Sequence, residues 1–287
     1  MRGLSAKLLR LLGIGGGALL SVVSCVTSTA VEYRPGGAGM IIPLYIYPED
    51  ARGRLPRSYD AVAKLARSRP ELQIIAVINP ADGPGEERDP NYRRAVRALS
   101  RAGVVLAGYV PWGYGSRDQA AVIADVGRWE RLYPGMSGIF VDEFPATTSR
   151  SRWNRELEPR VREIWRRAKE AGYSAVIANP GTPVPLSYYE SGLLDLIVVH
   201  EGPRWPEQPS ALGPALLPDS RRRSAVLIYG ATVWDPERFR SLADTVGYLF
   251  VNDFDRDMAG IRSYEWSHLP DNLREQAQLI VRESGGY

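Results

Sequence analysis

Eight short apolar segments recur along the chain, and they constrain the fold more than any other feature. They lie at residues 40–47, 72–79, 104–110, 138–143, 174–179, 196–201, 224–230 and 248–253. Each segment is continuously apolar and does not alternate with polar residues, which is typical of strands buried on both faces, as in parallel sheets. The sequence therefore predicts eight buried parallel strands.

Amphipathic segments between these runs predict helices. They lie at residues 92–102, 118–132, 152–171, 236–245 and 271–282. The helical pattern is weak between the first two strands. Five prolines between residues 203 and 218 exclude a long helix before the seventh strand, so we expect an irregular loop at 202–223. A repeated strand–helix unit of this length predicts an α/β fold, namely a single (β/α)8 TIM barrel.

The first residues have the features of an export signal. Three basic residues precede an apolar, Gly-rich stretch at 11–23 that is short for a membrane span. Cys25 follows Val-Val-Ser, which resembles a bacterial lipobox, where cleavage leaves an amino-terminal cysteine for lipidation. Cleavage of an ordinary signal peptide near Ala30 is the alternative. We expect a signal peptide at 1–24, a flexible linker at 25–39 and the barrel at 40–287, in a protein that is secreted or lipid-anchored at the outer face of a bacterial cell membrane.

The basic isoelectric point comes from the leader alone. Residues 1–24 contain three basic residues and no acidic ones, so the rest of the chain has 36 − 3 = 33 basic residues against 33 acidic residues. A neutral mature chain has no global field for phosphate, and we expect no nucleic-acid partner. Arg221–Arg223 is expected to be a solvated loop. The helix patterns show no sustained heptad, which favours a monomer.

Two of the expected strands end in acidic residues. The run GIFVDE ends in Asp142 and Glu143, and LIVVHE ends in Glu201. The carboxyl ends of all strands of a barrel surround one opening, so these acids can meet and are our candidate catalytic residues. Because alternate residues of a strand face opposite sides, Asp142 and Glu143 cannot both point inward while the strand continues. We expect Asp142 at the mouth and Glu143 to reach the site from the loop.

Amides and aromatic residues dominate the other strand ends. The candidate substrate-binding residues are Tyr45, Tyr47, Asn79, Tyr109, Trp112, Tyr114, Asn179, His200, Tyr229, Asn252 and Asp253. Aromatic faces stack on sugar rings, while amides and carboxylates bond to hydroxyl groups, so this set suits a polysaccharide substrate. The only other histidine is His268, and neither histidine has metal-ligand spacing. We expect no metal and no cofactor, and His200 is equally interpreted as a packing residue.

The stereochemistry of cleavage stays open at this stage. The fourth and sixth strands are separated by one strand, which places their backbones roughly 10 Å apart. Inward side chains can then bring two carboxyl groups to the separation of either a retaining or an inverting glycosidase. The sequence does not assign the acid and the nucleophile or base between Asp142 and Glu201.

Six motifs in a fixed order resemble the spherulation-specific family 4 proteins over residues 40–275. They are IIPLYIYP, INPADGPG, LAGYVPWGYGSR, GIFVDE, IANPGT and VVHEGP. The resemblance implies a (β/α)8 glycoside hydrolase similar to glycoside hydrolase family 135, whose fungal members cleave galactosaminogalactan, a polymer that contains α-1,4-linked N-acetylgalactosamine. It also implies that the acidic site of the family falls on Asp142, Glu143 and Glu201, and that the acetamido group of the sugar is an alternative nucleophile.

This chain departs from that resemblance at the rim of the expected site. Pro111 and Asn252 stand where many relatives carry threonine, and Tyr229 stands where they carry histidine. These differences put the identity of the substrate in question more than hydrolysis itself. We expect an endo-acting glycoside hydrolase of a hexosamine-containing exopolysaccharide; the alternative is a surface lipoprotein that binds polysaccharide on the same barrel without cutting it.

Overall fold

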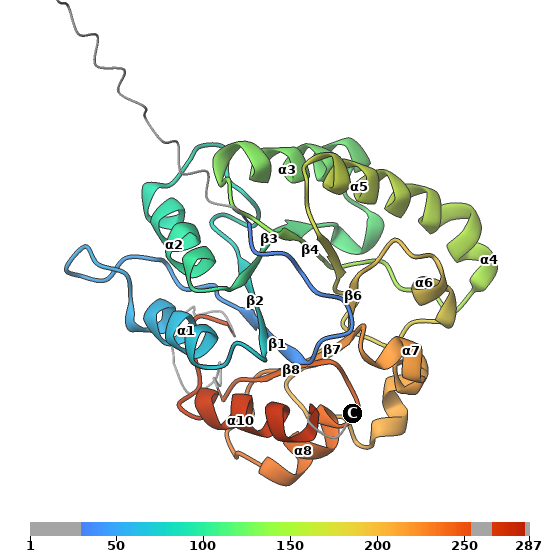
Figure 1. The fold of residues 1–287 in the computed structure, drawn as a ribbon. Helices are drawn as coiled ribbons and strands as arrows, with labels where there is room; N and C mark the ends of the chain where they lie inside the picture. Colours follow the sequence, from blue (N-terminus) through green and yellow to red (C-terminus); the bar gives the residue numbers. More distant parts are fainter. Residues whose placement is uncertain (1–29, 254–265, 285–287) are drawn as a thin grey trace, which may run out of the picture.

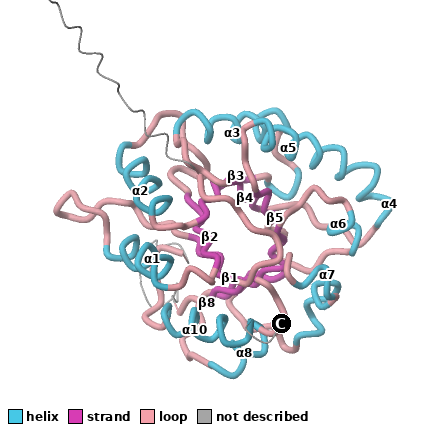
Figure 2. The backbone as a smooth tube through the Cα atoms, viewed as in Figure 1, coloured by secondary structure: helices cyan, strands magenta, loops and turns pink. Residues whose placement is uncertain are grey.

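The computed structural model describes residues 30–253 and 266–284, and its centre is a closed parallel barrel (Figures 1 and 2). The eight strands pair in chain order, and β1 and β8 close the barrel between Gly39 and Tyr248. The strands are β1 (Gly39–Pro43), β2 (Gln73–Ile78), β3 (Val105–Pro111), β4 (Gly138–Asp142), β5 (Ala175–Ala178), β6 (Leu196–Gly202), β7 (Ser224–Ile228) and β8 (Tyr248–Val251). The predicted α/β barrel is therefore confirmed, whereas the leader and Cys25 lie outside the described residues.

The strands are buried on both faces, as their continuous apolarity predicted. Every residue of β2, β5, β7 and β8 is buried. In a (β/α)8 barrel one face of each strand fills the interior and the other packs under the helices, so apolar residues dominate both faces. The polar residues Gln73 and Ser224 stand at the first positions of β2 and β7, where their side chains are hydrogen-bonded. The strand residues and the inner faces of the helices form one hydrophobic core.

The helices form a ring around the strands (Figure 2). They are α1 (Arg57–Ser68), α2 (Pro90–Arg101), α3 (Gln119–Leu132), α4 (Arg150–Arg152), α5 (Glu158–Glu170), α6 (Leu186–Glu190), α7 (Pro218–Arg221), α8 (Pro236–Ala243) and α10 (Leu273–Ser284). A π-helical turn at Trp153–Leu157 joins α4 to α5. Asp89, Asp118 and Asp235 cap α2, α3 and α8 by accepting bonds from first-turn amides.

Two connections differ from the sequence expectation. The weak pattern between the first two strands forms α1, which buries Tyr59, Val62 and Leu65 against the barrel. The loop expected to be irregular at 202–223 contains a 3-10 helix, η3 (Pro209–Leu216), followed by α7. The helices η3 and α7 each begin with proline, which is tolerated there because the amide at a first helical position has no intrahelical partner.

The chain enters the barrel across the end opposite the carboxyl termini of the strands. In Figure 1 the blue segment before β1 runs over this end. Tyr33 is buried, its amide donates to Oγ of Ser174 (2.9 Å) and its hydroxyl to the carbonyl of Asp195 (3.3 Å). The amide of Arg34 donates to Oε1 of Gln73 (2.9 Å). The packed domain thus extends back to Tyr33, within the segment that we expected to be a linker.

Across the described ranges, none of the helices has the length and apolarity that a membrane span requires.

Candidate active site

The backbone turns sharply where β4 ends, and this turn presents two acids. Asp142 is the last residue of β4, and Glu143 has a φ of 48°, in the left-handed region. That conformation costs a residue with a side chain about 1 kcal/mol. The amide of Trp112 donates to the carbonyl of Asp142 (2.9 Å), and the amide of Tyr114 donates to that of Glu143 (2.6 Å). The turn lets both acids line the same pocket, which a continuing strand would forbid.

Asn179 connects the acids of neighbouring strands. It follows β5, is 4% exposed, and its Nδ2 donates to Oδ1 of Asp142 (2.6 Å) and to Oε2 of Glu201. Its Oδ1 accepts from the amide of Gly181 (3.1 Å), whose carbonyl accepts from the amide of Glu201 (3.2 Å). Since both carboxylate oxygens bond to the same nitrogen, they lie at most two hydrogen-bond lengths, or roughly 6 Å, apart.

Asp142 is held in a buried, hydrogen-bonded environment. Burial raises the pKa of Asp142, while hydrogen bonds from Tyr109, the amide of Glu143 and Asn179 act in the opposite direction. The hydroxyl of Tyr109 donates to Oδ2 of Asp142 (2.7 Å). Burial and the negative charge of Asp142 raise the pKa of Tyr109, so the phenol keeps its proton and remains a donor. Tyr45 packs edge-on against Tyr109 with 5.7 Å between ring centroids.

A tryptophan from beyond β8 holds the carboxylate of Glu201. Its Oε1 accepts from the indole Nε1 of Trp266 (3.1 Å), which lies beyond β8. Trp266 is buried and packs edge-on against Tyr229 with 5.7 Å between centroids. The register of β6 against β7 shifts between Val198 and His200, just before Glu201. Nε2 of His200 lies 2.9 Å from the carbonyl of Arg204 and does not enter the pocket.

These side chains surround a pocket of about 590 Å³, within the usual range for small-molecule sites. Its lining residues are Tyr114, Asp142, Glu143, Asn179, Pro180, Gly181, Glu201, Tyr229 and Trp266. Three carboxylates and three aromatic side chains line it, and no lysine or arginine does. Within the described part of the chain, the carboxylate of Glu143 makes no hydrogen bond or ion pair, and Tyr114 is 69% exposed. The pocket therefore offers an acidic, partly aromatic surface.

Two expected substrate-binding residues are fully buried, and the structure corrects both expectations. Trp112 packs edge-on against Phe144 at 5.1 Å, and the guanidinium of Arg160 lies over its ring at 5.0 Å. Asn252 donates from Nδ2 to the carbonyl of His268 (3.1 Å). Both residues support the loops around the mouth, because each side chain turns into the packing beneath the rim.

Three further candidates lie outside the pocket lining. The hydroxyl of Tyr47 donates to Oδ2 of Asp89 (3.2 Å), and Asn79 uses its Oδ1 to accept from Gly83 (2.9 Å). Asp253 lies 3.2 Å from Nε2 of His268. Tyr109 bonds to Asp142 and Tyr45 packs against Tyr109, so neither of them lines the pocket. Of the eleven expected binding residues, Tyr114, Asn179 and Tyr229 line the pocket itself.

Strand-end reasoning missed Trp266 and the Pro180–Gly181 turn as parts of the lining. Trp266 follows β8 by fifteen positions (266 − 251 = 15), so its place in the sequence gives no sign that it reaches the mouth. The motif IANPGT did contain a signal for Gly181, whose φ of 63° favours glycine and whose carbonyl positions the amide of Glu201.

A neighbouring hollow of about 510 Å³ lies on the loops that follow β6 and β7. Its lining residues are Pro203, Arg204, Trp205, Glu207, Gly230, Ala231, Thr232, Val233 and Arg238. These residues follow Glu201 and Tyr229 directly in the chain, so the two hollows lie on the same pair of loops. In residues 30–253 and 266–284, His, Cys, Asp and Glu side chains form no group of three or more that could hold a metal ion.

The sequence model of spherulation-specific family 4 matches residues 39–280. The chain belongs to this family. The resemblance predicted from the six motifs is thereby confirmed, and the match spans every strand of the barrel.

This family 4 protein is similar to one curated protein in sequence and to one solved structure in fold. Spherulin-4 of Physarum polycephalum is 34% identical over 150 residues, which are 52% of this chain and 41% of the relative. The match thus spans about two fifths of that relative's length. The crystal structure of Aspergillus clavatus Sph3 in complex with GalNAc superposes with a TM-score of 0.67 at 24% identity, covering 86% of this chain and 98% of Sph3. This likeness shows that the two proteins share the barrel fold.

Proposed function

We propose that this family 4 protein is an exported, endo-acting glycoside hydrolase that cleaves a polysaccharide containing N-acetylhexosamine. The observation that carries the proposal is the pairing of Asp142 and Glu201 through Asn179 at the wall of the pocket. Two carboxyl groups within reach of one glycosidic bond are what glycoside hydrolysis requires. Glycosidic bonds break when one acid protonates the leaving oxygen while the other stabilises the positive charge at the anomeric carbon.

The surroundings of the two acids support separate roles. The raised pKa of Asp142 favours its protonated form, and a general acid needs that form near neutral pH. Glu201 accepts from two N–H donors, Nδ2 of Asn179 and Nε1 of Trp266, and such donors stabilise a carboxylate. We assign Asp142 as the acid and Glu201 as the nucleophile or base.

The short separation supports retention of configuration. Retaining glycosidases hold their carboxyl groups about 5–5.5 Å apart, whereas inverting ones need about 6.5–9.5 Å for a water molecule. In the proposed reaction the proton of Asp142 moves to the glycosidic oxygen as the bond from the anomeric carbon breaks. Glu201, or the acetamido oxygen of the substrate, bonds to that carbon. Water then displaces it and returns a proton to Asp142.

The pocket also supports the class of sugar. Glu143 presents a carboxylate with no partner in the described part of the chain, which is suited to accept from the N–H of an acetamido group or from a hydroxyl. A neutral sugar enters a pocket lined by acidic residues without charge repulsion, whereas a uronic acid is repelled by their carboxylates. Sph3, whose barrel superposes on this one, was crystallised with GalNAc. We therefore propose α-1,4-linked N-acetylgalactosamine as the unit that is cleaved.

The neighbouring hollow supports cleavage within a polymer. It adds a half-buried Trp205 and an exposed Val233 to the loops beside Tyr229, which are surfaces for further sugar rings. The export signal in residues 1–24 would bring the enzyme to extracellular polymers.

The experiment is a digest of an N-acetylgalactosamine-rich exopolysaccharide with measurement of new reducing ends and of product length. We expect wild-type protein to release oligosaccharides and Glu201→Ala to release none. Glu163→Ala, which removes an exposed glutamate of α5, is the matched control and should cleave normally. Tight binding of the polymer by wild-type protein without any new reducing ends would instead identify a non-catalytic polysaccharide-binding lipoprotein.

A further inference from the structure

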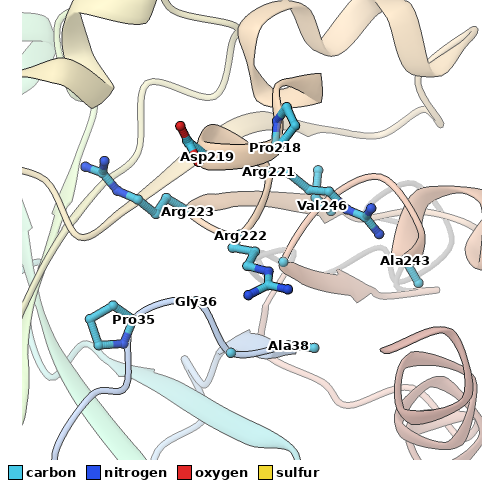
Figure 3. Close-up of a pocket in the computed structure, with 12 residues that line it drawn as sticks. Pro35, Gly36, Ala38, Pro218, Asp219, Arg221, Arg222, Arg223, Ala243 and Val246 are labelled. Carbon is cyan, nitrogen blue, oxygen red and sulfur yellow. The ribbon is translucent and has the colours of Figure 1, made fainter. Parts of the chain in front are cut away.

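A hollow of opposite character lies at the other end of the barrel (Figure 3). Its volume is about 640 Å³. Its lining residues are Pro35, Gly36, Gly37, Ala38, Pro218, Asp219, Arg221, Arg222, Arg223, Ala243, Val246 and Gly247. All of them precede β1, β7 or β8, so the hollow lies at the amino ends of the strands, away from Asp142 and Glu201.

The three arginines of this hollow have different surroundings. Arg223 donates to the backbone carbonyls of Tyr189 (3.0 Å) and Leu194 (2.5 Å), and Arg221 lies 3.2 Å from Oδ1 of Asp244. Arg222 is exposed, and its guanidinium forms no hydrogen bond or ion pair with the described residues. Figure 3 shows its guanidinium directed into the space above Gly36 and Ala38. Arg221 and Arg223 are thus engaged, unlike in the expected solvated loop, and Arg222 supplies the unpaired positive charge.

Four other arginines lie at the same end of the barrel as the hollow. The helices run antiparallel to the strands, so their last turns end there. Arg67, Arg101, Arg131 and Arg240 lie in the last turns of α1, α2, α3 and α8. All four are exposed, and none has a carboxylate of the described residues within ion-pair distance. One carboxylate of the hollow, Asp219, is also exposed and forms no ion pair with the described residues. Arg222 and the four helix-end arginines exceed that single negative charge, whereas three acids and no basic residue line the pocket at the mouth.

The first described residues of the chain pack at this same end. Tyr33 is fixed there by Ser174 and Asp195, which precede β5 and β6. Cys25 lies eight positions earlier (33 − 25 = 8). Eight residues span at most about 29 Å when fully extended, so a lipid on Cys25 would keep this end close to the membrane and turn the acidic mouth away.

We propose that this basic end, defined by Arg222 in its hollow and by Arg67, Arg101, Arg131 and Arg240, binds the phosphate groups of anionic phospholipids. A guanidinium binds phosphate through two parallel hydrogen bonds, and the hollow gives a headgroup phosphate access to Arg222. The attraction of basic residues to an anionic surface acts within about one Debye length, roughly 8 Å at physiological salt, which the short tether allows. The membrane then orients the pocket toward polymers outside the cell.

The test is flotation of the chain from residue 25 onward with phospholipid vesicles. Cys25→Ser prevents lipidation, and this chain contains every described element of the barrel. We expect it to bind vesicles made of a mixture of phosphatidylglycerol and phosphatidylcholine, and not to bind vesicles of phosphatidylcholine alone. The bound protein should dissociate as the salt concentration is raised. Arg222→Glu should weaken binding about thirtyfold, since each basic residue near an anionic surface contributes about 1 kcal/mol and the reversal counts twice.

Arg155→Glu is the matched control because Arg155 is exposed near the start of the α4–α5 helix, toward the mouth. It should bind vesicles like the parent chain, and both variants should keep the parent unfolding midpoint and hydrolytic rate. Equal binding to both vesicle types, or equal loss in both variants, would overturn the proposal. Binding of inorganic phosphate or of soluble polyphosphate, without vesicle binding, would also overturn it by showing a free-anion or polymer site.

Discussion

The hydroxyl of Tyr109 donates a hydrogen bond of 2.7 Å to Oδ2 of Asp142. This bond stabilises the carboxylate and lowers its pKa, whereas burial raises it, and burial has the larger effect. Asn179 donates to the other oxygen of Asp142 (2.6 Å). The protonation of the proposed acid is therefore set by a balance that single substitutions can shift.

Tyr109→Phe should move the alkaline limb of the pH profile of kcat to higher pH. The substitution removes a donor to the carboxylate, so the pKa of Asp142 rises further above its ordinary value. The measurement is kcat against pH for the polymer substrate. Tyr45→Phe is the control. It removes the hydroxyl of Tyr45 but keeps the ring that packs against Tyr109, so the bond from Tyr109 to Asp142 stays intact. An alkaline limb that stays in place or moves to lower pH in Tyr109→Phe would contradict the assignment of Asp142.

Asp142→Asn should make the protein more stable at neutral pH while slowing hydrolysis by about 10²- to 10⁴-fold. The folded pKa of Asp142 is above its ordinary value of 3.8, so its ionised form is less favourable in the folded state than in the unfolded chain. This cost is absent below the ordinary value, grows as pH rises through the folded pKa, and is complete above it. Urea midpoints across this range should show a gain for Asp142→Asn at neutral pH that vanishes in acid. A lower midpoint at neutral pH would refute the account.

Asn179→Ala should lower kcat about 10- to 100-fold. Its Nδ2 is the shared donor that holds Asp142 and Glu201 in place, and losses of this size follow the removal of positioning groups. Steady-state kinetics on the polymer measures the effect, and circular dichroism checks the fold. Asn154→Ala, at an exposed position, should keep the wild-type rate. Wild-type kinetics in Asn179→Ala would show that the bridge has no part in the reaction.

Glu143→Gly should be about 1 kcal/mol more stable than Glu143→Ala. Glu143 has a φ of 48°, which alanine adopts at a cost and glycine adopts freely. Both variants lose the carboxylate, so their comparison isolates the backbone. Chemical denaturation measures the difference. Equal stability, or a more stable alanine variant, would mean that the turn stores no strain.

The barrel could be predicted because its strands carry their own signal. Strands such as β2 and β7 are buried throughout and apolar after their first residue, a pattern that is typical of a sheet buried on both faces. The place of Asp142, Glu143 and Glu201 at one mouth could be predicted for a related reason, since the topology alone gathers the carboxyl ends of the strands. The place of Asn179 could be predicted in the same way, although its bridge between the two acids was not foreseen.

The remaining features depend on side-chain direction and on long-range packing. Trp112 follows β3, yet its ring turns under the rim toward Phe144, and no local pattern distinguishes that direction. Trp266 reaches Glu201 from a segment beyond β8. Tyr33 lies in a Gly- and Pro-containing stretch typical of a linker, and only the open end of the finished barrel provides the site in which it is buried.

The most direct test of the central claim, that Asp142 and Glu201 act together on one glycosidic bond, is a double-mutant cycle. Initial rates of reducing-end release from N-acetylgalactosamine-rich polymer would be measured for wild type, Asp142→Asn, Glu201→Gln and the double variant. Each single variant should lose about 10²- to 10⁴-fold, and the double variant should lose little more, because the two groups serve the same transition state. Wild-type rates in either single variant, or multiplied losses in the double variant, would contradict the account.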